Sequence, residues 1–181
     1  MQNSVSAEFP RWLWRAAWAG FFGVVIGGLL LVLVLAAGVA DPPRAGPLAW
    51  QAGPLTLESG GAPYKILLPS RPFTLEITAT LQGDPTADWG VDLSARYGIA
   101  LNGYRFLRIP HPDSDFQPFI HVRDGRNKIT LYVPANEPVT MRVNDEIAWK
   151  GPVPVLASVP AWIWVKSGRL RVENISLYYP K

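Results

Sequence analysis

The chain has 181 residues, a formal net charge of +3, two histidines and no cysteine. The missing cysteine excludes disulfides, thiolate zinc sites and cysteine-ligated iron–sulfur clusters. The basic residues are scattered, so the sequence shows no nucleic-acid surface, and it carries no cofactor-binding motif. The length allows one ordinary domain besides a membrane segment.

A long apolar run begins after a short tail of residues 1–15. It covers residues 16–40 and contains no charged side chain. A helix needs about 20 apolar residues to cross a bilayer, so the run predicts one transmembrane helix. Three tryptophans mark its N-terminal end, where indole rings favour the depth of the lipid headgroups: Trp12, Trp14 and Trp18.

The flanking charges predict the orientation of this helix. Arg11 and Arg15 precede it, whereas Asp41 and then Arg44 follow it. The positive-inside rule therefore places the N-terminus in the cytoplasm and the rest of the chain outside it, as a single-pass protein of the cell membrane. A cleaved signal peptide is the alternative, but the run is longer than the usual apolar core of such peptides.

Small residues repeat along one face of the predicted helix. They are Ala16, Ala19, Gly20, Gly23 and Gly27. Small side chains at this spacing let a second helix approach closely. The partners that we expect are therefore membrane lipid and a transmembrane helix of another subunit or of a second copy. The alternative is that glycine is simply frequent in membrane helices.

Residues 41–54 are rich in proline and predict a stiff, extended linker that holds the next domain near the membrane. Residues 55–181 then show strand patterns with turn signals between them. Apolar and polar residues alternate most clearly at 73–81, 89–95 and 129–133. Further strands are expected at 64–68, 104–109, 118–123, 139–143, 146–150, 161–166 and 169–179.

Two local signals refine this pattern. Asn144 and Asp145 separate two strand patterns and predict a two-residue hairpin turn. In the last strand the apolar set changes parity between Val172 and Ile175, which predicts a β-bulge near Glu173 and Asn174. The predicted fold is all-β, an antiparallel sandwich or jelly roll preceded by one transmembrane helix.

Residues 55–179 resemble the concanavalin A-like and laminin G-like sandwiches, in particular the branch named 3-keto-disaccharide hydrolase-like. The resemblance rests on RVND at 142–145 and RVENI at 171–175, together with the order of the strands. It implies the sandwich fold. Asp145 stands where that family usually has glycine, and no catalytic motif carries over.

Few residues suggest a metal site or catalysis. His111, Asp113 and Asp115 form a weak candidate metal site, although the same residues are ordinary turn formers. His121 is expected to lie on the outward face of a strand. Carboxylate pairs such as Asp92 and Glu76 could serve a glycosidase only if they faced one bond.

Trp162 and Trp164 share one face of a strand because they are two residues apart. If that face is buried, which is the commoner arrangement, they belong to the core. If it is exposed, they can stack on sugar rings, contact a partner or rest at the membrane.

These features favour a non-enzymatic, single-pass subunit whose exported sandwich docks on a larger membrane complex, such as one of respiratory or photosynthetic electron transport. The alternative is a membrane-tethered glycan-binding module or a glycoside hydrolase-like domain.

Overall fold

The computed structural model describes residues 11–40, 44–94, 97–109, 115–136, 138–152 and 160–180. They form two compact units, one ending at Pro42 and one beginning at Pro43. The first unit is the helix α1 (Arg11–Ala40), which begins five residues before the apolar run. Its segment Trp12–Leu33 has a mean hydropathy of 2.3 and is long and apolar enough to cross a membrane, a test that a signal sequence also passes.

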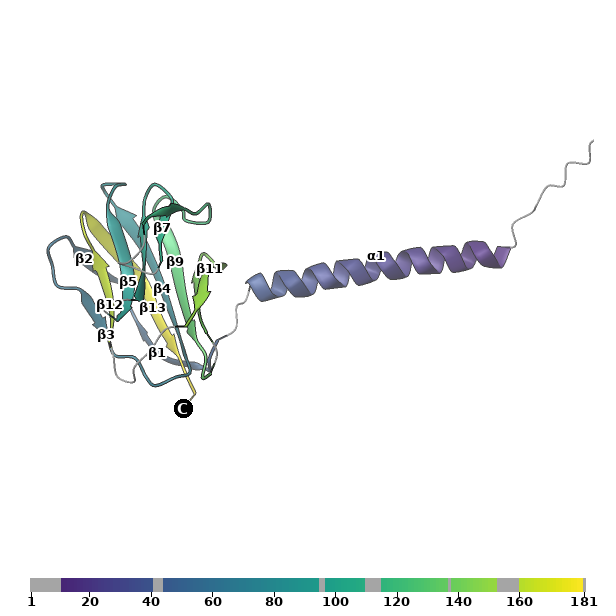
Figure 1. The fold of residues 1–181 in the computed structure, drawn as a ribbon, viewed down its shortest axis with the longest axis horizontal. Helices are drawn as coiled ribbons and strands as arrows, with labels where there is room; N and C mark the ends of the chain where they lie inside the picture. The colour runs from purple at the N-terminus through teal and green to yellow at the C-terminus, as the bar shows by residue number, and fades with distance from the viewer. Residues whose placement is uncertain are drawn as a thin grey trace, which may run out of the picture. The chain divides into compact units, whose positions relative to one another are not determined.

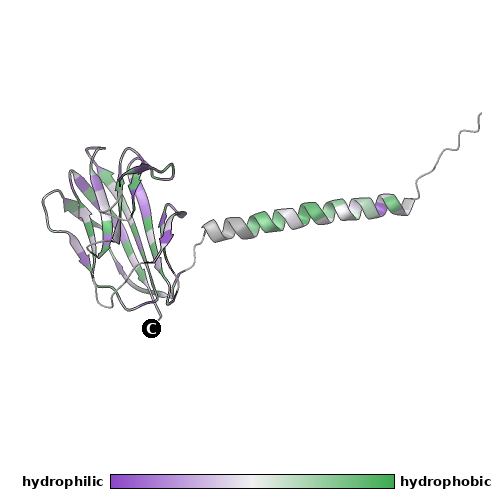
Figure 2. Ribbon diagram, in the orientation of Figure 1, coloured by the Kyte–Doolittle hydropathy of each residue, from purple (hydrophilic) through white to green (hydrophobic). Residues whose placement is uncertain are grey.

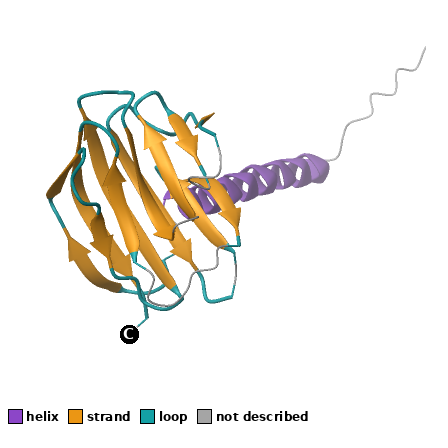
Figure 3. Cartoon of the chain, turned by 60° about the vertical axis from the view of Figure 1, so that its left-hand side comes forward, coloured by secondary structure: helices purple, strands orange, loops and turns teal. Residues whose placement is uncertain are grey.

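The second unit is a sandwich of two antiparallel sheets (Figures 1 and 3). Sheet A runs, in order, β1 (Leu48–Ala52), β13 (Arg169–Tyr178), β4 (Phe73–Gln82), β9 (Arg126–Val133), β10 (Val139–Val143) and β11 (Glu146–Gly151), with β2 (Leu55–Glu58) also paired to β13. Sheet B runs β3 (Tyr64–Ile66), β12 (Ala161–Val165), β5 (Asp88–Ser94), β6 (Tyr97–Asn102), β7 (Phe106–Arg108) and β8 (Gln117–Pro118).

Alternation along the strands creates the core between the sheets. In Figure 2 the strands change between apolar and polar colours from residue to residue, whereas α1 is apolar along most of its length. Leu75 and Ile77 of sheet A and Val91 and Ile163 of sheet B are fully buried. The buried apolar residues that form this core lie between Ile66 and Leu177, all within the second unit. The sandwich therefore supplies its own core without α1.

The turn and the bulge predicted from the sequence are both confirmed. Asn144 and Asp145 link β10 to β11 with φ of 51° and 73°. The register of β13 against β4 shifts between Val172 and Asn174, so Glu173 is the inserted residue. This shift lets Val172 and Ile175 both face the core.

Two predicted segments differ from the structure. Leu48–Ala52, assigned to the linker, is a strand that pairs with β13, because backbone pairing outweighs the low strand propensity of the prolines around it. The strand predicted at 118–123 is wrong: β8 contains only Gln117–Pro118, and the chain turns at Ile120 and His121.

Candidate ligand-binding face

The outer face of sheet B carries two rows of side chains that cross the strands. In the first row, Trp162 lies opposite Lys65 on one side and Asp92 on the other. Asp92 in turn lies opposite Gly98 of β6. These residues point away from the core because their neighbours Ile163 and Val91 are buried in it.

The second row runs from an aromatic ring to a cation over two small residues. Trp164 lies opposite Gly90, Gly90 opposite Ala100, and Ala100 opposite Arg108. Strands in a sheet are about 4.8 Å apart, so the backbones of Trp164 and Arg108 are about 14 Å apart. We call these eight positions, Lys65, Trp162, Asp92, Gly98, Trp164, Gly90, Ala100 and Arg108, the sheet B face.

Glycine allows the tryptophan of the second row to lie close against the sheet. A Cβ atom on Gly90 would come within 2.9 Å of Trp164 Cζ2 and would also collide with the carbonyl oxygen of Ile99. The ring of Trp164 is half-buried over this position. Gly98 likewise leaves room for Asp92, because Asp92 Oδ1 occupies the space that a Cβ on residue 98 would need.

Cations accompany the aromatic rings on this face. Lys65 Nζ lies 5.5 Å from the ring centre of Trp162, and Arg108 Cζ lies 4.5 Å from that of Phe116. Within the described residues, the buried Nε of Arg108 has no hydrogen-bond partner. The face thus combines aromatic surface, a carboxylate and cationic donors, the groups that recognise polar ligands with an apolar side.

Comparison with known proteins identifies the fold. No family model and no curated protein matches the chain. Among solved structures, sheep galectin-11 in complex with glycerol is similar over 66% of this chain and 99% of its own, with 9% identity and a TM-score of 0.50. A variant of human galectin-16 is similar over 68% of this chain and 100% of its own, with 12% identity and a TM-score of 0.50. The second unit is a concanavalin A-like β-sandwich.

Part of a larger protein from A. japonicus, CB05, has a similar structure. It is similar over 80% of this chain and 27% of its own, with 15% identity and a TM-score of 0.50. At such identities the likeness concerns the concanavalin A-like fold and transfers no activity.

The sandwich separates Glu76 and Asp92, the pair of carboxylates named from the sequence. Glu76 points outward from sheet A, whereas Asp92 points outward from sheet B, so the two cannot flank one bond. Asp88 shares the face of Asp92 and lies four positions before it in β5, so the two Cα atoms are about 13 Å apart.

The weak metal candidate is only partly within the described residues. His111 and Asp113 lie outside them, and Asp115 is exposed. The described residues contain no group of three or more metal-ligating side chains.

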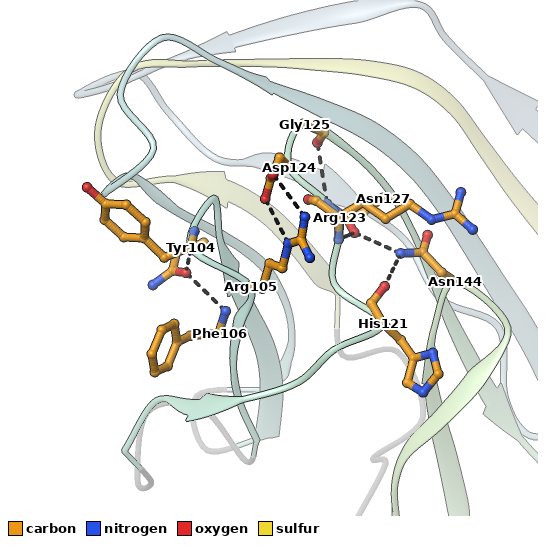
Figure 4. Close-up of polar contacts among 10 residues, drawn as sticks. Tyr104, Arg105, Phe106, His121, Arg123, Asp124, Gly125, Asn127 and Asn144 are labelled. Atoms are coloured by element: carbon orange, nitrogen blue, oxygen red, sulfur yellow. Dashed lines mark hydrogen bonds and ion pairs between the residues drawn. The ribbon is translucent and has the colours of Figure 1, made fainter.

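His121 does not lie on a strand, contrary to the sequence-based expectation. Its carbonyl oxygen accepts a hydrogen bond of 2.6 Å from Asn144 Nδ2, and its ring lies 5.2 Å from that of Phe119. The same Nδ2 donates to Asn127 Oδ1 at 2.8 Å (Figure 4). Asn127 and Asn144 therefore hold the loop before β9 in place. Residues 118–123 alternate between apolar and polar side chains although most of them form a loop and not a strand.

The residues predicted for helix packing and for the lipid interface all lie in α1. Ala16, Ala19, Gly20, Gly23 and Gly27 are exposed in the isolated helix. Trp12, Trp14 and Trp18 are exposed as well, and the rings of Trp14 and Trp18 stack at 5.9 Å. Their roles in helix packing and at the lipid interface remain predictions.

Sequence reasoning placed Trp162 and Trp164 on one face but did not identify their neighbours. Lys65, Arg108 and the small residues between the rows were missed. The pattern WGVDLS at 89–94 held a usable signal, because its alternation already puts Gly90 and Asp92 on the same, outward side.

Proposed function

We propose that this protein is a non-catalytic carbohydrate-binding module held at the membrane by α1, with the sheet B face as its ligand site. The observation that carries the proposal is the partly exposed Trp164, whose ring lies against Gly90 in the row that ends at Arg108. An aromatic surface can contact the apolar side of a sugar ring, while Asp92, Lys65 and Arg108 offer hydrogen bonds to its hydroxyl groups.

A glycan array probed with residues 43–181 tests this function. This segment contains every buried core residue that the structure describes, so we expect it to fold alone. Trp164→Ala should weaken binding to the recognised glycan about two- to tenfold, because an aromatic contact is worth about 0.5–1.5 kcal/mol beyond its buried area. Trp50→Ala is the matched control, since Trp50 is an exposed tryptophan on β1 of the other sheet.

Each outcome decides the proposal. Binding that is unchanged in Trp50→Ala and weakened in Trp164→Ala supports the sheet B face, provided that both variants keep a cooperative thermal transition. A wild-type domain that binds no glycan on the array rejects the function. Equal effects of the two substitutions reject this face as the site.

A second candidate is a subunit of a larger membrane complex, favoured by the open small-residue side of α1. In the described chain no atom lies within 4 Å of a Cβ placed on Gly23 or Gly27, beyond the neighbours within the helix itself. Gly23→Ile should then release a stoichiometric partner during purification in mild detergent, whereas Val24→Ile should not. A chain that purifies without any partner contradicts this role.

A further inference from the structure

β1 is an edge strand of sheet A and β3 is an edge strand of sheet B. An apolar cleft of about 350 Å³ lies at this edge of the sandwich. Its lining comes from both sheets, and we call it the edge cleft: Trp50, Lys65, Ile66, Leu67, Leu177 and Tyr179. It lies at the side of the sandwich and is distinct from the rows on the outer surface of sheet B, apart from Lys65, which borders both.

Large apolar side chains are exposed at this edge. Leu67 is 73% exposed and Trp50 38%, and Leu48, two residues before Trp50, is 48% exposed. A group of exposed apolar side chains around a cleft marks a contact surface rather than ordinary surface leucines. The cation of Lys65 lies beside them.

The edge cleft adjoins the segment that connects the sandwich to α1. Arg44 Nε lies 3.0 Å from Glu76 Oε1, and the Ala45 amide donates to Thr74 Oγ1 at 2.9 Å. Gly46 is packed so closely on Tyr179 that a Cβ would lie 2.6 Å from its carbonyl carbon. Tyr179 itself lines the cleft, so the fixed connecting segment leads directly to it.

Chain length keeps the sandwich close to the membrane if α1 spans it. Only residues 41–43 separate Ala40 from Arg44, and an extended chain covers at most about 3.5 Å per residue. A short tether raises the effective concentration of a second contact to about the millimolar range. A dissociation constant of the edge cleft for lipid below this range would then keep the cleft occupied.

We propose that the edge cleft rests on the lipid surface of the membrane that α1 spans. Leu48, Trp50 and Leu67 enter the headgroup region, where tryptophan is favoured, and Lys65 faces the lipid phosphates. The proposal depends on α1 being a membrane span, and Lys65 is the one residue that it shares with the proposed sugar site. It orients the sandwich, so that its edge and not its sheet B face meets the bilayer.

The absence of cysteine allows a direct test on the full chain. Leu67→Cys and the control Ile120→Cys, each carrying one polarity-sensitive fluorophore, are placed in nanodiscs of phosphatidylcholine and phosphatidylglycerol. Ile120 is 82% exposed and lies in the loop after β8, so its label reports solvent. We expect a blue-shifted emission for the label at 67, and at least threefold stronger quenching by lipids that carry a quencher.

Three results would overturn the proposal. The two labels can behave alike, which means that the edge cleft does not meet lipid. The signal at 67 can vanish in nanodiscs that hold a single copy, which means that a second copy covers the cleft. The chain can fail to insert into nanodiscs, which means that α1 is not a membrane span.

Discussion

Arg44 and Glu76 form an ion pair of 3.0 Å between the connecting segment and the outer face of sheet A. The Glu76 side chain is only 10% exposed, and Lys128 Nζ lies 4.0 Å from the same oxygen. Arg44 Cζ also lies 5.1 Å from the ring centre of Tyr178. The segment after α1 is therefore attached to the sandwich by side chains as well as by the backbone.

Arg44→Ala should lower the free energy of unfolding by about 1–2 kcal/mol, because Glu76 is left nearly buried with a weaker partner. Hydrogen exchange at the Ala45 amide should become faster, since its bond to Thr74 loses support. Arg169→Ala is the matched control: its pair with Glu58 is exposed on both sides and should contribute less than 1 kcal/mol. Equal losses in thermal melts of the two variants would contradict the role of Arg44.

Asn144→Ala should destabilise the sandwich by about 3 kcal/mol. The side chain donates to His121 and Asn127 and accepts from the Lys128 amide at 2.9 Å, and alanine would also sit poorly at a φ of 51°. Asn136→Ala, at an exposed turn position, should change stability by less than about 0.5 kcal/mol. Urea unfolding curves of the two variants provide the comparison.

Glu173 should make stability depend on pH in the acidic range. The hydrogen bond from Arg126 at 2.7 Å, supported by one from Thr80, lowers the pKa of Glu173 below its ordinary value of 4.5. A carboxyl whose pKa is lower in the folded state stabilises the fold above its unfolded pKa, and this contribution is lost as the pH falls through the folded pKa.

The difference in melting temperature between wild type and Glu173→Gln should therefore be largest near neutral pH and shrink below about pH 4. Arg126→Gln should flatten the same pH dependence, because it removes the principal cause of the shift. A difference that stays constant between neutral and acidic pH would show that Glu173 acts through packing alone.

Gly90→Ala should cost about 2 kcal/mol or more, because the new methyl group meets the Ile99 carbonyl and the ring of Trp164. In a Trp164→Ala background the same substitution should cost less, since one of the two collisions is gone. Thermal melts of the single and double variants measure this coupling. Additive effects would mean that the ring does not lie over Gly90 in solution.

The sequence predicted most strands of the sandwich because alternation reports a half-buried strand directly. It failed at β6, where Gly98, Ile99, Ala100 and Leu101 are all buried and no alternation remains. It also failed at β1, because the prolines on either side indicate a linker.

The candidate site was predicted less well than the fold. The spacing of Trp162 and Trp164 predicts that they lie on the same face of their strand. Ile163 between them is also apolar, so hydropathy could not decide which face of the strand points outward. The strand partners decide it, and those are set by residues about 70 positions away, at Trp89 to Asp92. Pairing over such distances is not visible in local patterns.

The position of β13 has a consequence for biosynthesis. This strand pairs with β1, β2 and β4, yet it begins only at Arg169. A nascent chain that stops before Arg169 lacks β13. The strands β1, β2 and β4 then lack a hydrogen-bonding partner. The sandwich can therefore close only after β13, the last of its strands along the chain, has been synthesised.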